Sequence, residues 1–231
     1  MVVLHPQLVM LAFPVGQAYL WHGRDGLTLV DTSVPGSGPQ IQRVIGELGY
    51  LRRDLRRILL THCHEDHVGA AAELAGRLDV EVVAHRLDAP VIRGEAAVAP
   101  PVLSDWERRL WDQVHAQMSD EPPPPVRVDR EVDDGDDIDL GGGVHAVCVA
   151  VPGHTAGSVA YYLPEPRILF AGDTIAGGPD GGVMLGVFNA DPERAAASFR
   201  RQADLDAEIA CFGHGRPLTG DAATHLRAAA A

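Results

Sequence analysis

The sequence is poor in cysteine and in long apolar runs, and each shortage excludes a class of protein. Its three cysteines, Cys63, Cys148 and Cys211, are far apart and odd in number, so neither a disulfide framework nor a CxxC metal knuckle is expected. We expect them to be small buried hydrophobic residues in a reducing compartment. The apolar run from Leu8 to Val15 is too short to span a bilayer and lacks the basic flank and cleavage site of a signal peptide. A cytoplasmic protein with no membrane partner is therefore predicted.

Basic side chains are also scarce relative to acidic ones. The chain carries 19 basic and 32 acidic residues, which gives a formal net charge of −13. A field of this sign repels phosphate backbones, so no nucleic-acid partner is expected. The 46% of hydrophobic and 22% of charged residues are typical of a globular enzyme, and 231 residues suffice for a single domain over 1–231.

Apolar spacing predicts strands and helices along the chain. Apolar residues recur with helical spacing over 41–48, between a cap at Ser37 and a stop at Gly49. Residues 94–125 are the least regular part; they hold a helix-like segment around Trp106 and end in four prolines, which cannot lie inside a helix. Strands are predicted at 17–22, 27–31, 57–60, 80–84, 126–132, 144–151, 158–163, 167–171 and 208–212, and further helices at 68–78, at 192–203 and at the C-terminus.

These elements form two similar sets, split near residues 122–126. The pattern suits an α/β (α+β) architecture in which two sheets pack face to face with helices outside. The aspartate-rich stretch 133–139 lacks the spacing of an EF-hand, so it is predicted to be a solvated hairpin turn rather than a calcium site.

The most informative segment, residues 61–67, directly follows the predicted strand at 57–60. It holds His62, His64, Asp66 and His67 in close succession. Alternate side chains at a strand end point the same way, so His62 and His64 can face one point while Asp66 and His67 turn toward a second. Imidazole and carboxylate are the ligands of catalytic zinc sites, in which one coordination position stays open. A loop that is merely rich in histidine is the disfavoured alternative, because the same chain supplies further ligands.

Three further candidate ligands, His154, Asp173 and His214, each follow a predicted strand and have glycine beside them. Glycine lets the backbone approach a metal closely and permits positive φ in a tight loop. One such histidine alone would more often be an ordinary polar group than a ligand. Ligand-type residues at four strand ends, taken together, predict a metal centre.

The combined pattern resembles the ligand signature of the metallo-β-lactamase-fold hydrolases, and the resemblance covers nearly the whole chain, including the strand-end Asp31. It implies an αββα sandwich with two metals at one edge between the sheets. It also implies how the ligands divide: His62, His64 and His154 hold the first metal, Asp66, His67 and His214 hold the second, and Asp173 bridges both.

Such a site implies cleavage of an ester, thioester or lactone bond of a small molecule by a hydroxide that bridges two divalent ions. Zinc is the first choice, and iron or manganese also suit the ligands. Ions about 3.5–4 Å apart need a bridging carboxylate and hydroxide to offset their repulsion, and they lower the pKa of the bridging water toward about 7. Asp66 would act as general acid–base catalyst. Asp31 would orient a ligand histidine, with an ordinary turn residue as the equal alternative.

Two other functions stay open. Mononuclear-iron persulfide dioxygenases share the ligand string, but they carry a characteristic stretch after the bridging aspartate that residues 175–182 do not match. A metal-binding protein with little turnover is the other. Among the hydrolases, glyoxalase II thioesterases and N-acyl-homoserine lactonases share the seven ligands, although the lactonases have a tyrosine after the bridging aspartate and residues 174–213 contain none.

The substrate pocket is expected beside the metals, under the irregular segments 94–125 and 177–189. Trp106, Trp111, Met184 and Phe188 are candidates for its wall. For the aromatic residues, a place in the ordinary core is the favoured interpretation.

Overall fold

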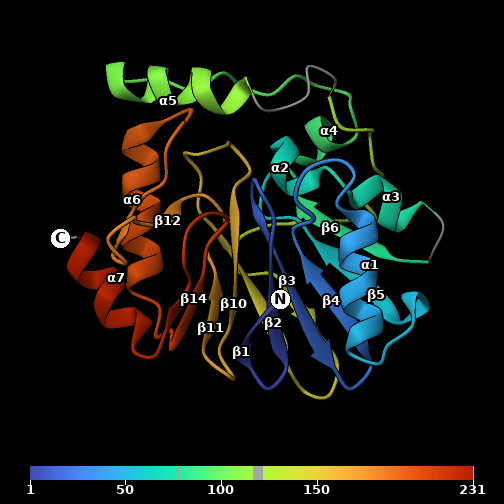
Figure 1. Ribbon diagram of the computed structural model, residues 1–231. Coiled ribbons are helices and arrows are strands. Elements are labelled where there is room, and N and C mark those ends of the chain that lie inside the picture. Colours follow the sequence, from blue (N-terminus) through green and yellow to red (C-terminus); the bar gives the residue numbers. More distant parts are fainter. Residues whose placement is uncertain (77–78, 117–121, 231) are drawn as a thin grey trace.

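Two β-sheets lie face to face in the computed structural model, which describes residues 1–76, 79–116 and 122–230 (Figure 1). The first sheet has seven strands in sequence order, antiparallel from β1 to β4 and parallel from β4 to β7. The second has six strands in the order β15-β14-β11-β10-β9-β8, and only β11 and β14 pair in parallel. The chain passes from one sheet to the other between residues 132 and 137, somewhat after the predicted split at 122–126.

The bounds of the elements are as follows. The first sheet consists of β1 (Val2–His5), β2 (Leu8–Ala12), β3 (Gln17–Gly23), β4 (Gly26–Val30), β5 (Leu55–Leu59), β6 (Glu81–His85) and β7 (Arg130–Val132). The second consists of β8 (Asp137–Asp139), β9 (His145–Ala150), β10 (Val159–Leu163), β11 (Ile168–Phe170), β14 (Ile209–Cys211) and β15 (Leu218–Thr219), while β12 (Ile175–Gly177) and β13 (Val183–Leu185) form a separate hairpin. The helices are α1 (Gly38–Glu47), the 3-10 turn η1 (Arg52–Asp54), α2 (Glu65–Val68), α3 (Ala71–Ala75), α4 (Ala89–Ile92), α5 (Asp105–His115), α6 (Pro192–Ala203) and α7 (Ala222–Ala230).

Strands that are buried on both faces separate three apolar cores. Successive side chains of a strand point to opposite faces, so Leu8 and Met10 of β2 lie between the sheets while Val9 and Leu11 lie in the outer core. Because β2 is buried on both sides, it shows no polar alternation, and the strand is therefore not among those predicted from the sequence.

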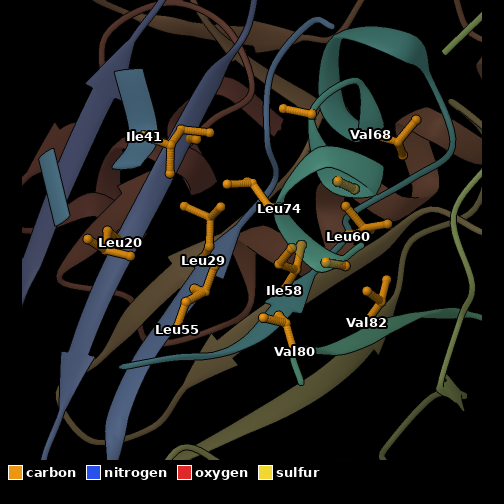
Figure 2. Close-up of a cluster of buried hydrophobic side chains, with 14 of the residues drawn as sticks. Leu20, Leu29, Ile41, Leu55, Ile58, Leu60, Val68, Leu74, Val80 and Val82 are labelled. Atoms are coloured by element: carbon orange, nitrogen blue, oxygen red, sulfur yellow. The ribbon is translucent and has the colours of Figure 1, made fainter. Parts of the chain in front are cut away.

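Helices cover the outer face of each sheet. Figure 2 shows side chains of α1 and α3, including Ile41 and Leu74, gathered with Leu29 of β4 and Ile58 of β5. On the other side, α6 and α7 cover the second sheet in a core that includes Phe199 (Figure 1). The predicted αββα sandwich is therefore confirmed.

The helix predicted over 68–78 is present only as α3 (Ala71–Ala75), because the chain breaks at 69–70 after the separate short helix α2; residues 77–78 lie outside the described part. Thr32 causes the break. Its backbone N–H and its hydroxyl donate to the carbonyl of His67 at 2.7 and 2.9 Å, and its Oγ1 accepts from Ala70 N at 3.1 Å. These are groups that a continuous helix would pair internally. The break leaves α2 as a single turn that carries Asp66 and His67.

The segment made of residues 94–116 and 122–125, here called the roof, crosses one end of the sandwich, where α5 lies above the loops (Figure 1). Residues 117–121, which belong to the predicted irregular region, lie outside the described part. The roof helix α5 begins with a capping box between Ser104 and Glu107 and contains no buried residue. Across the described residues, no helix is both long enough and apolar enough to cross a bilayer.

Candidate metal centre

All seven predicted ligands lie at one edge of the sandwich, where four strands end. β5 leads into the loop and the helix α2 that carry four of them, and β9, β11 and β14 each lead to one more. They form two clusters, and within each cluster all the ligand atoms lie within 4.8 Å of one another. The first cluster is His62, His64 and His154, and the second is Asp66, His67, Asp173 and His214.

The first cluster consists of three imidazole rings that converge on one point. His64 Nδ1 lies 3.1 Å from His62 Nε2 and 2.9 Å from His154 Nε2. Burial and then the neighbouring histidines lower the pKa of His62 well below its ordinary value and that of His154 to about 3. These rings are therefore neutral at physiological pH, which is the form that binds a metal.

The second cluster combines carboxylates with imidazoles. His214 Nε2 lies 3.0 Å from Asp66 Oδ2, and Asp173 has the largest part in raising the pKa of His214 to about 10. Burial alone would raise the pKa of Asp66, but His67 and His214 outweigh it and lower that pKa to about 2. Burial would likewise raise the pKa of Asp173, but His214 and His67 lower it well below its ordinary value, so both carboxylates are ionised, as metal ligands must be.

Asp173 faces both clusters. Its Oδ2 lies 3.7 Å from His154 Nε2 of the first cluster and 3.3 Å from His214 Nε2 of the second, and its Oδ1 lies 3.3 Å from His67 Nε2. The backbone beside it must be glycine, since a Cβ at Gly213 would overlap Asp173 Oδ1 and the ring of His67.

The donor set fits divalent cations. His67 Nε2 and Asp173 Oδ1 are buried and have no hydrogen-bond partner, although buried polar atoms are almost always paired. Both atoms point into the second cluster, and imidazole nitrogen with carboxylate oxygen is a ligand set that zinc, iron and manganese accept.

Asp31 supports the second cluster from behind, as the sequence analysis proposed. Its carboxylate lies 2.8 Å from His67 Nδ1 and accepts two hydrogen bonds of 2.8 Å from Thr61, one from the backbone and one from the hydroxyl. The contact fixes Nδ1 of His67 on the inner side and directs Nε2 toward the cluster.

Asp88 is a residue of the site that the sequence analysis missed. It is 2% exposed, and its carboxylate accepts hydrogen bonds from Cys63 N at 2.9 Å, from the Thr155 hydroxyl at 2.7 Å and from Gly157 N at 2.7 Å. One side chain thereby ties the loop that carries His62 and His64 to the loop that carries His154. The available signal was its place just after the predicted strand at 80–84.

A cavity of about 1090 Å³ opens onto the two clusters beneath the roof. Trp111 and Phe188 line it and meet edge to face at 5.0 Å, so the expectation that they belong to the ordinary core is wrong. Trp106 and Met184 are 49% and 37% exposed and are not among the wall residues of the described part. Trp106 therefore belongs neither to the core nor to the pocket.

A four-layered sandwich with ligand clusters at one edge defines the class of metal-dependent hydrolases. The chain belongs to the metallo-beta-lactamase superfamily, whose family model matches residues 13–214. It is 28% identical over 208 residues to a probable metallo-hydrolase of Bacillus subtilis (strain 168), which covers 83% of this chain and 76% of that protein. It is 30% identical over 198 residues to the hydroxyacylglutathione hydrolase of Rhodobacter capsulatus, with 85% of this chain and 61% of that enzyme covered.

Solved structures agree with this assignment. A metallo-beta-lactamase family protein of Thermus thermophilus superposes with a TM-score of 0.69 at 26% identity, over 99% of this chain and 78% of that one. A subclass B3 metallo-beta-lactamase of Bradyrhizobium japonicum reaches a TM-score of 0.71 at 21% identity, over 99% and 88% of the two chains, and shows the shared fold alone.

Proposed function

We propose that the protein hydrolyses an ester, thioester or lactone bond of a small molecule with two divalent metal ions, zinc in the first place. The observation that carries the proposal is the Asp173 carboxylate, which lies between the two clusters: Oδ2 is near both His154 and His214, and Oδ1 is near His67. The clusters lie at the base of a cavity whose volume suits a small-molecule substrate.

Each cluster would hold one ion. The ligands are His62, His64 and His154 for one ion and Asp66, His67 and His214 for the other, with Asp173 shared. When bound, the two ions supply a water-derived nucleophile at neutral pH and a Lewis acid for the carbonyl of the substrate.

Asp66 is the proposed acid–base group. Its Oδ2 lies 3.0 Å from His214 Nε2, and its pKa is lowered to about 2, so the side chain is an ionised carboxylate with a second oxygen that can take part in proton transfer. Asp66 lines the cavity, within reach of a leaving group bound there. We assign to it the transfer of the proton from the attacking water to the leaving group.

A small-molecule partner and a cytoplasmic location complete the proposal. The net charge of −13 opposes nucleic acid as a substrate. The three cysteines are free and buried, as in proteins of reducing compartments.

Asp66→Asn tests this function, because it keeps the size of the side chain and removes its charge and one acceptor oxygen. We expect kcat on an activated ester or lactone to fall roughly 10²–10⁴-fold, the range for a general acid–base group. KM should change much less, since the carboxylate acts mainly in the transition state. Glu73→Gln on α3, an exposed carboxylate outside the cavity, is the matched control.

The assay is repeated without oxygen. Hydrolysis needs no oxygen, whereas persulfide oxidation does. Activity that disappears anaerobically and survives Asp66→Asn would contradict the hydrolase and indicate the mononuclear-iron alternative.

A further inference from the structure

The wall of the cavity changes character with distance from the metal centre. At the base, ligand-type side chains such as His64, Asp66 and Asp173 are exposed to it. Away from the base, the wall is supplied by α4, by the roof helix α5 and by residues of the segments 94–101 and 122–125. Apart from His115 of α5, its larger side chains are apolar: Val91, Ile92, Leu110, Trp111, Val114 and Phe188.

The wall also lacks the charges that would bind an anionic substrate. Among the described residues that line the cavity none is arginine, and the whole sequence contains no lysine. The carboxylates on the wall are Glu65, Asp66 and Asp173, and the net charge of the chain is −13. Away from the base, His115 is the imidazole of the described wall, and it stacks on Trp111, while the metal ions would lie at the base. A carboxylate at the far end of a bound molecule would lose its hydration without gaining an arginine or lysine partner.

The size of the cavity leaves room beyond the reacting group. Pockets for drug-sized molecules measure roughly 300–1,000 Å³. At about 1090 Å³, this cavity exceeds what a short acyl group such as acetyl would fill. The unfilled part is the apolar part under the roof, where each buried methylene group contributes favourable free energy.

We propose that the cavity binds the uncharged, extended aliphatic acyl chain of the substrate, with the scissile carbonyl at the metal clusters and the chain under α5. This assignment rests on the proposed hydrolase function and names its substrate class. Short acyl groups and acyl groups that end in a carboxylate are poor substrates in this view, as are thioesters of anionic carriers.

A series of p-nitrophenyl esters from acetate to decanoate tests the proposal on the metal-loaded protein. We expect kcat/KM to rise about two- to fourfold per methylene group until the cavity is filled, which is the gain when a methylene group leaves water. An ester of adipic acid with one free carboxylate is the matched anionic substrate. It should be hydrolysed at least tenfold more slowly than the hexanoate ester.

Val114→Trp places a large ring in the apolar part of the wall. Val114 is half-buried on a helix without buried residues, so the substitution spares the cores of the sandwich. We expect at least a tenfold loss of kcat/KM for octanoate and decanoate and less than a twofold change for acetate. Arg109→Ala on the same helix, outside the cavity wall, should leave the whole series unchanged.

Binding to the metal-free protein gives a readout that does not depend on catalysis. Unbranched methyl ketones of increasing length are titrated by calorimetry. Their Kd should fall with each methylene group in the wild type and in Arg109→Ala, and should stop falling at shorter lengths in Val114→Trp.

The outcomes separate the two proposals. Metal-dependent hydrolysis with no dependence on acyl length, or with equal rates for the anionic ester, would overturn the acyl-chain assignment and leave the hydrolase function intact. Length-dependent ketone binding that stops increasing at shorter lengths in Val114→Trp, without hydrolysis of any ester, thioester or lactone, would support the cavity assignment and refute the hydrolase function.

Discussion

The base and the cover of the cavity are built in opposite ways. We call the seven candidate ligands together with Asp31 and Asp88 the floor. Its residues follow the ends of buried strands, and the two supporting carboxylates accept several hydrogen bonds each. The roof has a helix with no buried residue. Its contacts with the opposite loop include Val102 N to Asn189 O at 2.9 Å and Phe188 N to Glu107 Oε1 at 3.2 Å.

This difference separates two kinds of effect. A side chain of the floor is held from several directions, so its removal changes how metal is bound and how fast the reaction proceeds. The roof is held by few bonds, so a change there alters the free energy of substrate binding and leaves the chemistry in place.

The largest effect is expected from Asp173→Ala in the floor. The substitution removes the carboxylate that faces both clusters, so two cations would repel each other with less compensation. Wild-type protein purified without chelator should contain close to two metal equivalents by elemental analysis. The variant should lose at least one equivalent and nearly all hydrolysis while its circular dichroism is unchanged. Asp180→Ala, in an exposed turn, is the control; full metal content in Asp173→Ala would show that the bridge is misassigned.

A smaller effect is expected from Asp88→Asn, because Asp88 belongs to the floor but contacts the loops that carry the ligands and not the ligand side chains. The amide group cannot accept the hydrogen bonds of both Cys63 N and Gly157 N, so the two ligand loops are no longer held in register. We expect metal affinity, measured by competition with a chelator, to fall about 10–100-fold, as for other residues that orient metal ligands. Asp129→Asn is the matched control, because Asp129 also accepts a backbone N–H, from Val82, near the start of β6. If both variants lose stability and neither loses metal affinity, Asp88 supports only the fold.

The smallest effect is expected in the roof, from Glu107→Gln. Glutamine can retain the capping box with Ser104, but its amide nitrogen cannot accept the hydrogen bond from Phe188 N. KM for a long-chain ester should rise about two- to fivefold, the effect of one hydrogen bond, with kcat unchanged. Hydrogen exchange in α5 should become faster, while Arg108→Ala should change neither quantity. A fall in kcat with no change in KM would contradict the separation of floor from roof.

The hydrogen bond from Phe188 N to the Glu107 carboxylate weakens at low pH. Burial works against it, but hydrogen bonds from Ser104 and Phe188 lower the pKa of Glu107. A lowered pKa means that the contact is intact above about pH 4 and weakens only as the pH falls through the lowered pKa.

The ligands could be predicted from the sequence because each one is a local feature. A histidine or aspartate at the end of a buried strand is visible within a few residues, and parallel strand ends meet at one edge of the sandwich. Asp88 could not be predicted in this way. Its partners lie 25, 67 and 69 residues away, so only the folded chain shows that its carboxylate joins two loops.

Apolar spacing predicted most of the strands and helices, the family resemblance implied how they are layered, and the misses have physical reasons. β2 is buried on both faces and lacks alternation, and the helix over 68–78 is broken because Thr32, distant in sequence, takes the bonds of His67 and Ala70. Helical spacing places Trp106 one turn before Leu110 on the same stripe of α5. The cavity ends between the two residues, so Trp106 is exposed to solvent while Leu110 lines the wall.

The distribution of the ligands over the two sheets has a consequence for the chain as a whole. The first cluster takes His62 and His64 from the half of the chain that forms the first sheet and His154 from the other half. The second cluster is likewise assembled from both, so neither half carries a complete coordination sphere. Two fragments produced by cleavage within residues 133–136 would regain a complete cluster only by complementation, as a reassembled pair. Retention of metal would therefore measure how firmly the halves are docked, and we expect separation of the sheets and release of the proposed ions to be one cooperative event.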